Sequence, residues 1–174
     1  MPVVEQTRVV PFRAEQMFDL VTDVKHYPEF LPWCVAARIR EQSDAHMIAD
    51  LVIGFQVIRE RFTSDVRFDR AALRVDTALV DGPFRHLTNK WRFRDLPDGK
   101  GCEIEIHVDF AFRSALLQRL IEPLFEEAQK RMVGAFEKRA RAIYGAAGGT
   151  AGGTAGGGAG SSASSTSPKA SATV

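Results

Sequence analysis

Two hydrophobic periodicities divide this chain. Over residues 114–144 the apolar side chains recur every three or four positions, which is typical of an amphipathic helix. The main stripe consists of Leu117, Ile121, Leu124, Ala128, Met132 and Phe136. Ser114 is suited to the N-cap of this helix, and Gly145 is suited to its end. Pro123 predicts a kink, or a short helix followed by a long one, because proline removes a backbone donor.

From residue 35 to residue 113 the period changes to two, which is typical of strands that bury one face. In the clearest segment, one face holds only apolar side chains: Cys102, Ile104, Ile106, Val108, Phe110 and Phe112. Turn sequences at residues 81–83 and 97–101 leave short links, and short links join antiparallel strands. Upstream, residues 3–10 predict a strand and residues 14–22 a short helix. The sequence therefore predicts an α+β fold with one strand, two small helices, about six more strands and the long helix. We expect a curved antiparallel sheet of about seven strands wrapped around that helix.

The composition changes sharply after residue 145. Residues 146–174 are almost entirely Gly, Ala, Ser and Thr, a composition that buries too little apolar surface to order a chain. We therefore expect one domain over residues 1–145 and a disordered tail over residues 146–174. Of the 23 basic residues only Lys169 lies in the tail, so the domain has 22 basic and 22 acidic residues. This balance argues against DNA as a partner, although basic residues near the end of the long helix leave room for a local patch.

The titratable residues give little support to catalysis. None of the four histidines has a second histidine or a carboxylate at a spacing suited to a metal site or a proton relay. Cys34 and Cys102 are isolated, which disfavours both a zinc site and a disulfide framework. The chain has no phosphate-binding loop and no dinucleotide fingerprint. We therefore expect a protein that is not an enzyme, with no catalytic residue, no metal and no cofactor.

The N-terminal sequence favours a cytoplasmic protein. It has neither a charged stretch followed by an apolar core nor an arginine-rich amphipathic presequence. No run approaches the roughly 18 apolar residues of a membrane span. We therefore expect any contact with the inner membrane to be peripheral.

A curved sheet closed by one helix leaves a concave apolar interior, where small molecules commonly bind. From the sheet we expect a lining of Leu51, Ile53, Phe55, Phe62, Leu87, Trp91 and Phe110. From the helix we expect Leu120, Leu124, Phe125 and Met132. The segment 27–34 adds Phe30, Leu31 and Trp33. This last cluster is a lid, a membrane contact or the closure of the barrel end. Each of these residues can also be explained as ordinary core.

Three separated motifs carry a family resemblance. They are Tyr27-Pro-Glu-Phe-Leu-Pro-Trp-Cys34, then Leu79-Val-Asp-Gly-Pro-Phe84 leading to Trp91-Arg-Phe93, and finally Leu124-Phe-Glu-Glu-Ala128 through Met132-Val-Gly-Ala-Phe136. Over residues 3–144 the chain resembles the coenzyme Q-binding family of START-like proteins, within the polyketide cyclase/dehydrase-like superfamily. The resemblance implies a helix-grip fold and a hydrophobic tunnel that binds ubiquinone or a similar isoprenoid lipid as a ligand. It also implies quinone delivery in support of respiratory electron transport.

Two other functions stay open at this point. The same motifs mark a bacterial ribosome-association toxin, described as binding the large ribosomal subunit and preventing its pairing with the small one. The wider superfamily also contains cyclases and dehydratases, and an enzyme of that type would need polar groups in the cavity, for which Asn89 and Arg38 are the candidates. We favour lipid binding, because an apolar interior poor in acids and bases suits a prenyl chain. In this interpretation the loop from Tyr27 to Trp33 contacts the membrane interface, where Tyr and Trp are common.

Overall fold

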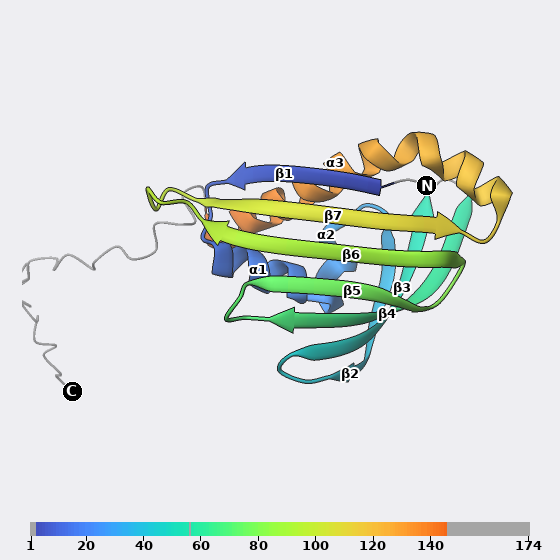
Figure 1. Cartoon of the computed structure of the whole chain (residues 1–174), viewed down its shortest axis with the longest axis horizontal. Helices are drawn as coiled ribbons and strands as arrows, with labels where there is room; N and C mark the ends of the chain where they lie inside the picture. The colour runs from blue at the N-terminus through green and yellow to red at the C-terminus, as the bar shows by residue number, and fades with distance from the viewer. Residues whose placement is uncertain (1–2, 56, 146–174) are drawn as a thin grey trace, which may run out of the picture.

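The computed structural model describes residues 3–55 and 57–145 of the chain (Figure 1). Its elements are β1 (Val3–Val10), α1 (Ala14–Thr22), the 3₁₀ turn η1 (Val24–His26), α2 (Tyr27–Phe30), β2 (Cys34–Gln42), β3 (His46–Phe55), β4 (Ile58–Asp69), β5 (Arg74–Asp81), β6 (Phe84–Asp95), β7 (Cys102–Phe112) and α3 (Ala115–Tyr144). The expected order of one strand, short helices, six strands and a long helix is confirmed. The tail predicted over residues 146–174 lies outside the described residues.

The strands form one antiparallel, seven-stranded sheet in the order β1-β7-β6-β5-β4-β3-β2. From β2 to β7 each strand lies beside the next in the chain, because the links between them are short. Register shifts at residues 34–36, 39–41, 63–64 and 84–86 mark bulges, which bend a strand and increase its twist. Figure 1 shows the resulting curved sheet with the helices behind strands β5, β6, β7 and β1. The expected helix-grip fold is confirmed.

The alternation predicted for residues 102–112 is confirmed in β7. All six apolar side chains of its inner face are buried, whereas Glu105 on the other face is exposed. At the preceding turn Gly101 has φ +157°, and a Cβ atom there would lie 2.1 Å from the carbonyl oxygen of Val10. Glycine therefore allows this turn to approach the end of β1.

The ends of α3 lie where the sequence predicts. The Ser114 hydroxyl accepts a hydrogen bond from the Leu117 backbone N–H at 3.3 Å, which satisfies one of the free donors of the first turn. Gly145 has φ +83° and ends the helix. The helix continues through Pro123, so the alternative of two separate helices is wrong. Proline removes only one hydrogen bond of the ladder, and the residues after it remain packed against the fold.

Burial in α3 is concentrated from the middle of the helix to its end. The buried residues of the helix are Gln129, Val133, Phe136 and Ala140. The ring of Phe136 lies nearly edge-on to three other rings, with centroids 5.2 to 5.4 Å away: Tyr27, Phe30 and Trp91. Edge-to-face contacts of this kind add to the free energy of burial. These contacts hold the second half of α3 against α2 and β6, while the side chains of residues 115–128 are half-buried or exposed.

One carboxylate is buried on the outer face of the sheet. Asp50 of β3 is 4% exposed and accepts hydrogen bonds from Thr63 at 2.6 Å, Arg40 at 2.7 Å and Arg61 at 3.0 Å. Burial by itself would raise the pKa of Asp50, but the hydrogen bonds from these three residues lower that pKa to about 2. The ionised carboxylate therefore stabilises the folded state.

Asp50→Asn is expected to lower the free energy of unfolding near pH 7 by about 1 to 2 kcal/mol, because two arginines lose their shared carboxylate. The folded-state pKa of about 2 lies below that of an unfolded aspartate, so the contribution is present above about pH 4 and is lost as the pH falls towards 2. Urea unfolding at about pH 7, 5 and 3 measures the difference between wild type and variant. That difference should narrow at the lowest pH, and a constant difference would contradict the assignment.

Candidate ligand-binding cavity

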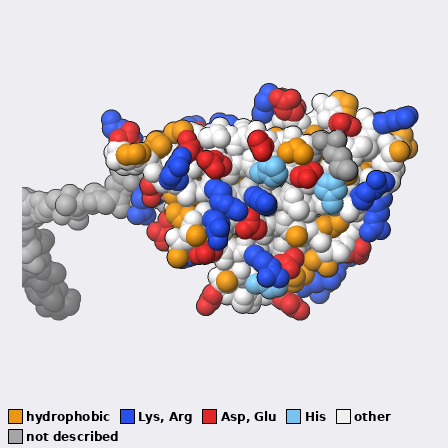
Figure 2. Space-filling model, in the orientation of Figure 1, with side chains coloured by type: hydrophobic (Ala, Val, Ile, Leu, Met, Phe, Trp, Pro, Cys, Tyr) orange, Lys and Arg blue, Asp and Glu red, His pale blue; other side chains and the backbone are white. Residues whose placement is uncertain are grey.

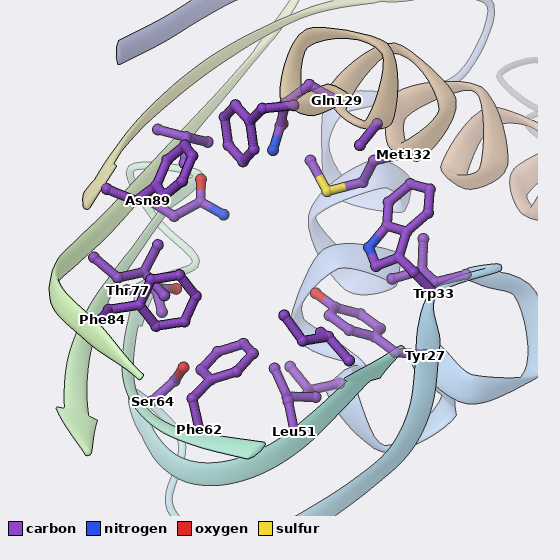
Figure 3. A pocket seen from close by; sticks show the side chains of 18 of the residues that line it. Tyr27, Trp33, Leu51, Phe62, Ser64, Thr77, Phe84, Asn89, Gln129 and Met132 are labelled. Carbon is purple, nitrogen blue, oxygen red and sulfur yellow. The ribbon is translucent and has the colours of Figure 1, made fainter. Parts of the chain in front are cut away.

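A cavity of about 240 Å³ lies between the concave face of the sheet and α3. Figure 3 shows it enclosed by strand side chains such as Phe62 and Leu51, with Gln129 and Met132 of α3 on the opposite side. Among the described residues, no charged side chain belongs to the lining, and most of the lining residues are aliphatic or aromatic. An interior of this composition suits an apolar ligand.

Eleven of the fourteen residues expected at the cavity line it: Leu31, Trp33, Leu51, Ile53, Phe62, Leu87, Trp91, Phe110, Leu124, Phe125 and Met132. They come from all three expected sources, which are the segment before β2, the inner face of the sheet and α3. Because alternate residues of a strand share a face, one inward residue indicates that the residues two positions away also point inward. The role of these residues in binding a ligand stays a prediction.

The structure corrects the placement of two other expected residues. Phe30 packs its ring against Tyr27 and Phe136, so it belongs to the contact between α2 and α3. Leu120 is 49% exposed, because the apolar stripe in the first half of α3 is wider than the face that the helix buries. The side chain of Phe55, at the end of β3, lies outside the described part of the structure.

Besides Tyr27, four uncharged polar side chains line the cavity: Ser64, Thr77, Asn89 and Gln129. Three of their oxygens, Ser64 Oγ, Asn89 Oδ1 and Gln129 Oε1, are buried and have no hydrogen-bond partner within the described part of the chain. The sequence analysis identified only Asn89. Ser64 could have been found, because it lies two residues beyond Phe62, a spacing that places both on the same face of β4.

The expectation that Arg38 enters the cavity is wrong. Arg38 of β2 lies directly opposite Asp50 of β3, and directly opposite residues of an antiparallel pair share a face. Asp50 precedes the cavity residue Leu51, so the two point to opposite faces. Arg38 is therefore on the outer face, where it is exposed. One of the two polar residues on which the enzyme alternative depends is thus outside the cavity.

The buried thiols and the tyrosine of the cavity are not activated for catalysis. Burial raises the pKa of the Cys34 thiol to about 11 and that of the Cys102 thiol to about 12, so both stay protonated near neutral pH. Burial also raises the pKa of Tyr27, whose hydroxyl donates a hydrogen bond to the Val21 carbonyl oxygen. These groups are suited to packing and to neutral hydrogen bonding.

Each histidine pairs with a carboxylate, and in three of the four pairs the partner lies far away in the sequence. The pairs are His26–Asp23, His46–Asp65, His86–Asp109 and His107–Glu5, with N to O distances of 2.7 to 3.0 Å. None of these histidines lines the cavity. Within residues 3–55 and 57–145, no group of three or more potential ligands could hold a metal ion. No helix of these residues is long and apolar enough to cross a membrane.

The curved antiparallel sheet, the long C-terminal helix and the apolar cavity between them define a START-like helix-grip protein. Residues 10–137 match the family described as polyketide cyclase / dehydrase and lipid transport. The chain belongs to this family, as the sequence motifs indicated.

Relatives with two kinds of name are similar to this chain in sequence. The chain is 37% identical over 142 residues to the ribosome association toxin RatA of Rickettsia prowazekii, covering 80% of this chain and 96% of the relative. It is 39% identical over 145 residues to RatA of Vibrio cholerae, covering 83% and 99%. It is 36% identical over 143 residues to the mitochondrial coenzyme Q-binding protein COQ10 homolog B of Xenopus laevis, covering 80% and 58%. The comparisons therefore favour the ribosome alternative over the quinone carrier.

Solved structures share the fold. An aromatase/cyclase, Zhui of Streptomyces sp. R1128, superposes with a TM-score of 0.74 at 20% identity, covering 84% of this chain and 98% of the other. An 18 kDa protein of Caulobacter crescentus superposes with a TM-score of 0.69 at 36% identity, covering 84% and 100%. The likeness to the cyclase is one of fold alone, which does not establish a shared reaction.

Ala128→Phe is expected to weaken binding of the apolar dye Nile red by roughly tenfold, because Ala128 lines the cavity and a phenyl ring there would occupy part of it. Fluorescence titration measures the affinity. Ala142→Phe is the matched control, since Ala142 is exposed near the end of the same helix. Equal dye affinity in the two folded variants would contradict the cavity as the binding site.

Proposed function

We propose that this chain associates with ribosomes. The observation that carries the proposal is the match to two ribosome association toxins, which extends over 96% and 99% of their lengths at 37% and 39% identity. A match over whole proteins supports a shared function better than a shared fold does. The large subunit is the expected partner from the family resemblance.

Five arginines at one end of the molecule, here named the arginine end, suit the phosphates of ribosomal RNA. They lie near the β3–β4 turn, near the β5–β6 turn and at the start of α3, and all are exposed: Arg59, Arg61, Arg85, Arg113 and Arg119. Figure 2 shows basic side chains gathered at this end, on the right. Of the five, only Arg61 forms an ion pair within the described residues. Because the domain as a whole is neutral, binding to RNA would depend on such a local patch.

The end of α3, where the sequence left room for a basic patch, is a weaker candidate. Most of its basic residues pair with carboxylates, as in Arg139 with Glu29 and Arg141 with Glu137, each at 2.8 Å. Earlier in the helix, Lys130 pairs with Glu126 and Arg131 with Glu127, each carboxylate lying one turn before its partner. These pairs leave less positive charge available to a polyanion.

Charge reversal at the arginine end is expected to weaken ribosome binding by on the order of tenfold or more, because each lost phosphate contact also removes counterion release. The variant carries three substitutions: Arg59→Glu, Arg85→Glu and Arg119→Glu. The matched control makes the same change in net charge at three exposed lysines elsewhere: Lys25→Glu, Lys90→Glu and Lys138→Glu. Co-sedimentation with purified ribosomal subunits measures binding. If the wild type sediments with neither subunit, the proposal fails, and if both variants lose binding equally, the arginine end is not the contact.

A second candidate, carriage of ubiquinone or a similar prenyl lipid, is supported by the cavity itself. The lining is uncharged and largely apolar, and one relative is named as a coenzyme Q-binding protein. Moving an isoprenoid unit of about five carbons out of water would contribute roughly 3 to 4 kcal/mol. A quinone in a bilayer already has apolar surroundings, so the net gain on entering the cavity is about zero. That balance suits exchange at a membrane surface rather than tight retention.

A lipid carrier needs a surface that contacts the bilayer, and exposed leucines beside the cavity are suited to that contact. Leu116, Leu120 and Leu124 follow one another at helical spacing along α3 and are 67%, 49% and 38% exposed. Leu124 also lines the cavity, so this leucine stripe leads to the rim. Trp33, the membrane contact expected from the sequence, is only half-exposed and lines the cavity. An apolar stripe flanked by arginines suits the surface of an anionic bilayer.

Leu116→Gln combined with Leu120→Gln is expected to weaken binding to vesicles of phosphatidylglycerol and phosphatidylcholine by roughly tenfold, because two apolar side chains no longer enter the bilayer. Vesicle flotation measures binding. The control replaces two valines of similar exposure on other elements, Val9→Gln and Val80→Gln. Trp33→Ala is expected to slow ubiquinone transfer between vesicles. The proposal that this chain carries a prenyl lipid fails if the leucine variant binds vesicles as tightly as wild type and Trp33→Ala transfers ubiquinone at the wild-type rate.

A further inference from the structure

Buried polar oxygens without partners mark one part of the cavity wall. Ser64 is 1% exposed and Gln129 is 8% exposed, and neither Ser64 Oγ nor Gln129 Oε1 has a hydrogen-bond partner among the described residues. Asn89 Oδ1 is buried and unpartnered in the same way. A buried polar group without a hydrogen-bond partner destabilises the folded state. A cavity that keeps three such groups is therefore suited to a ligand that satisfies them.

These oxygens belong to one continuous surface. Thr77 of β5 lies directly opposite Asn89 of β6, and Ser64 of β4 lies opposite Leu79, two residues along β5 from Thr77. The three polar strand residues thus cross adjacent strands on the inner face of the sheet. Figure 3 shows them along one side of the cavity, with Gln129 of α3 at the same end as Asn89. We name Ser64, Thr77, Asn89 and Gln129 the polar wall.

We propose that the polar wall binds the uncharged, oxygen-bearing head of an isoprenoid ligand, and that the cavity rejects prenyl ligands with an ionised head. Hydroxyl and carboxamide groups donate and accept hydrogen bonds without carrying charge. No Lys, Arg or His belongs to the lining within the described residues, so nothing there offsets a buried phosphate or carboxylate. Burying an unpaired charge costs far more than burying a neutral polar group. The inference rests on the proposal that the cavity holds a prenyl lipid, and it is independent of ribosome association.

The carboxamides of Asn89 and Gln129 allow the polar wall to bind the head of the ligand in either its oxidised or its reduced form. A carboxamide presents its oxygen or its NH₂ group after rotation about its last side-chain bond. The polar wall can therefore donate to a ketone or quinone oxygen, which only accepts, and can accept from an alcohol, which also donates. Both kinds of head are neutral, whereas a diphosphate is not.

Three probes that share one prenyl skeleton test the proposal: farnesol, farnesyl diphosphate and farnesene, which lacks the oxygen. Each is titrated into the full chain, and the fluorescence of Trp33 and Trp91, both in the lining, reports binding. Farnesol is expected to bind most tightly. Farnesene should bind about tenfold more weakly, and the diphosphate at least about a hundredfold more weakly.

Variants of the polar wall separate recognition from a structural role. In Ser64→Ala and in Gln129→Leu, the advantage of farnesol over farnesene should shrink, while the affinity for farnesene stays equal or rises. A residue that only supports the fold would change both affinities together. Gln42→Leu, at an exposed position of β2, is the control for the amide substitution and should preserve the advantage.

The possible outcomes distinguish a failure of this inference from a failure of the prenyl-lipid proposal on which it rests. If wild-type protein binds farnesol and farnesene equally, or binds the diphosphate as tightly as the alcohol, the polar wall does not select a neutral head, although the cavity still binds prenyl chains. If none of the three probes binds, the prenyl-lipid proposal fails and the inference fails with it.

Discussion

The packing of Phe136 against Tyr27, Phe30 and Trp91 is the contact on which the arrangement of this protein depends. It joins α3 to α2 and to the middle of the sheet, so the helix is held firmly by its second half. Large aromatic side chains contribute much of the free energy of a core, and one such cluster can anchor a helix. The first half of α3 is less deeply buried and lines the cavity, with Phe125 against Phe110 of the sheet. The cavity therefore lies beside the part of the helix that packs less tightly against the sheet.

Most of the fold follows from local rules that the sequence displays openly. Period-two and helical patterns, the Ser114 cap and the Gly145 stop predict nearly every element, because each depends on neighbours in the chain. Contacts between distant elements are harder to predict. The ring partners of Phe30 and the exposure of Leu120 depend on where α3 crosses the sheet, which no spacing reveals. Arg38 is different, since it alternates with inward residues of β2, and the pattern already placed it on the outer face.

Only Asn89 of the polar wall is predicted from the sequence, for a different reason. A search for an apolar lining passes over polar residues, so it does not select Ser64, Thr77 or Gln129, although all three line the cavity. A polar side chain at an inward position is an exception that a folded chain rarely keeps without a partner, since an unpaired buried group costs free energy. In a cavity protein these exceptions are the most informative positions. They indicate the chemistry of the ligand, while the surrounding leucines and phenylalanines indicate only that it is apolar.

The two proposed functions place demands on the same end of the molecule. Arg119 lies between Leu116 and Leu120 in the sequence of α3, and the leucine stripe reaches the cavity rim at Leu124. A surface that faces ribosomal RNA cannot face a bilayer at the same moment. If both activities belong to this chain, ribosome binding and exchange of a prenyl ligand with a membrane therefore exclude each other at this end. Any influence of ligand loading on ribosome affinity would then have to be matched by an equal influence of the ribosome on ligand affinity, because coupling between two binding equilibria is reciprocal.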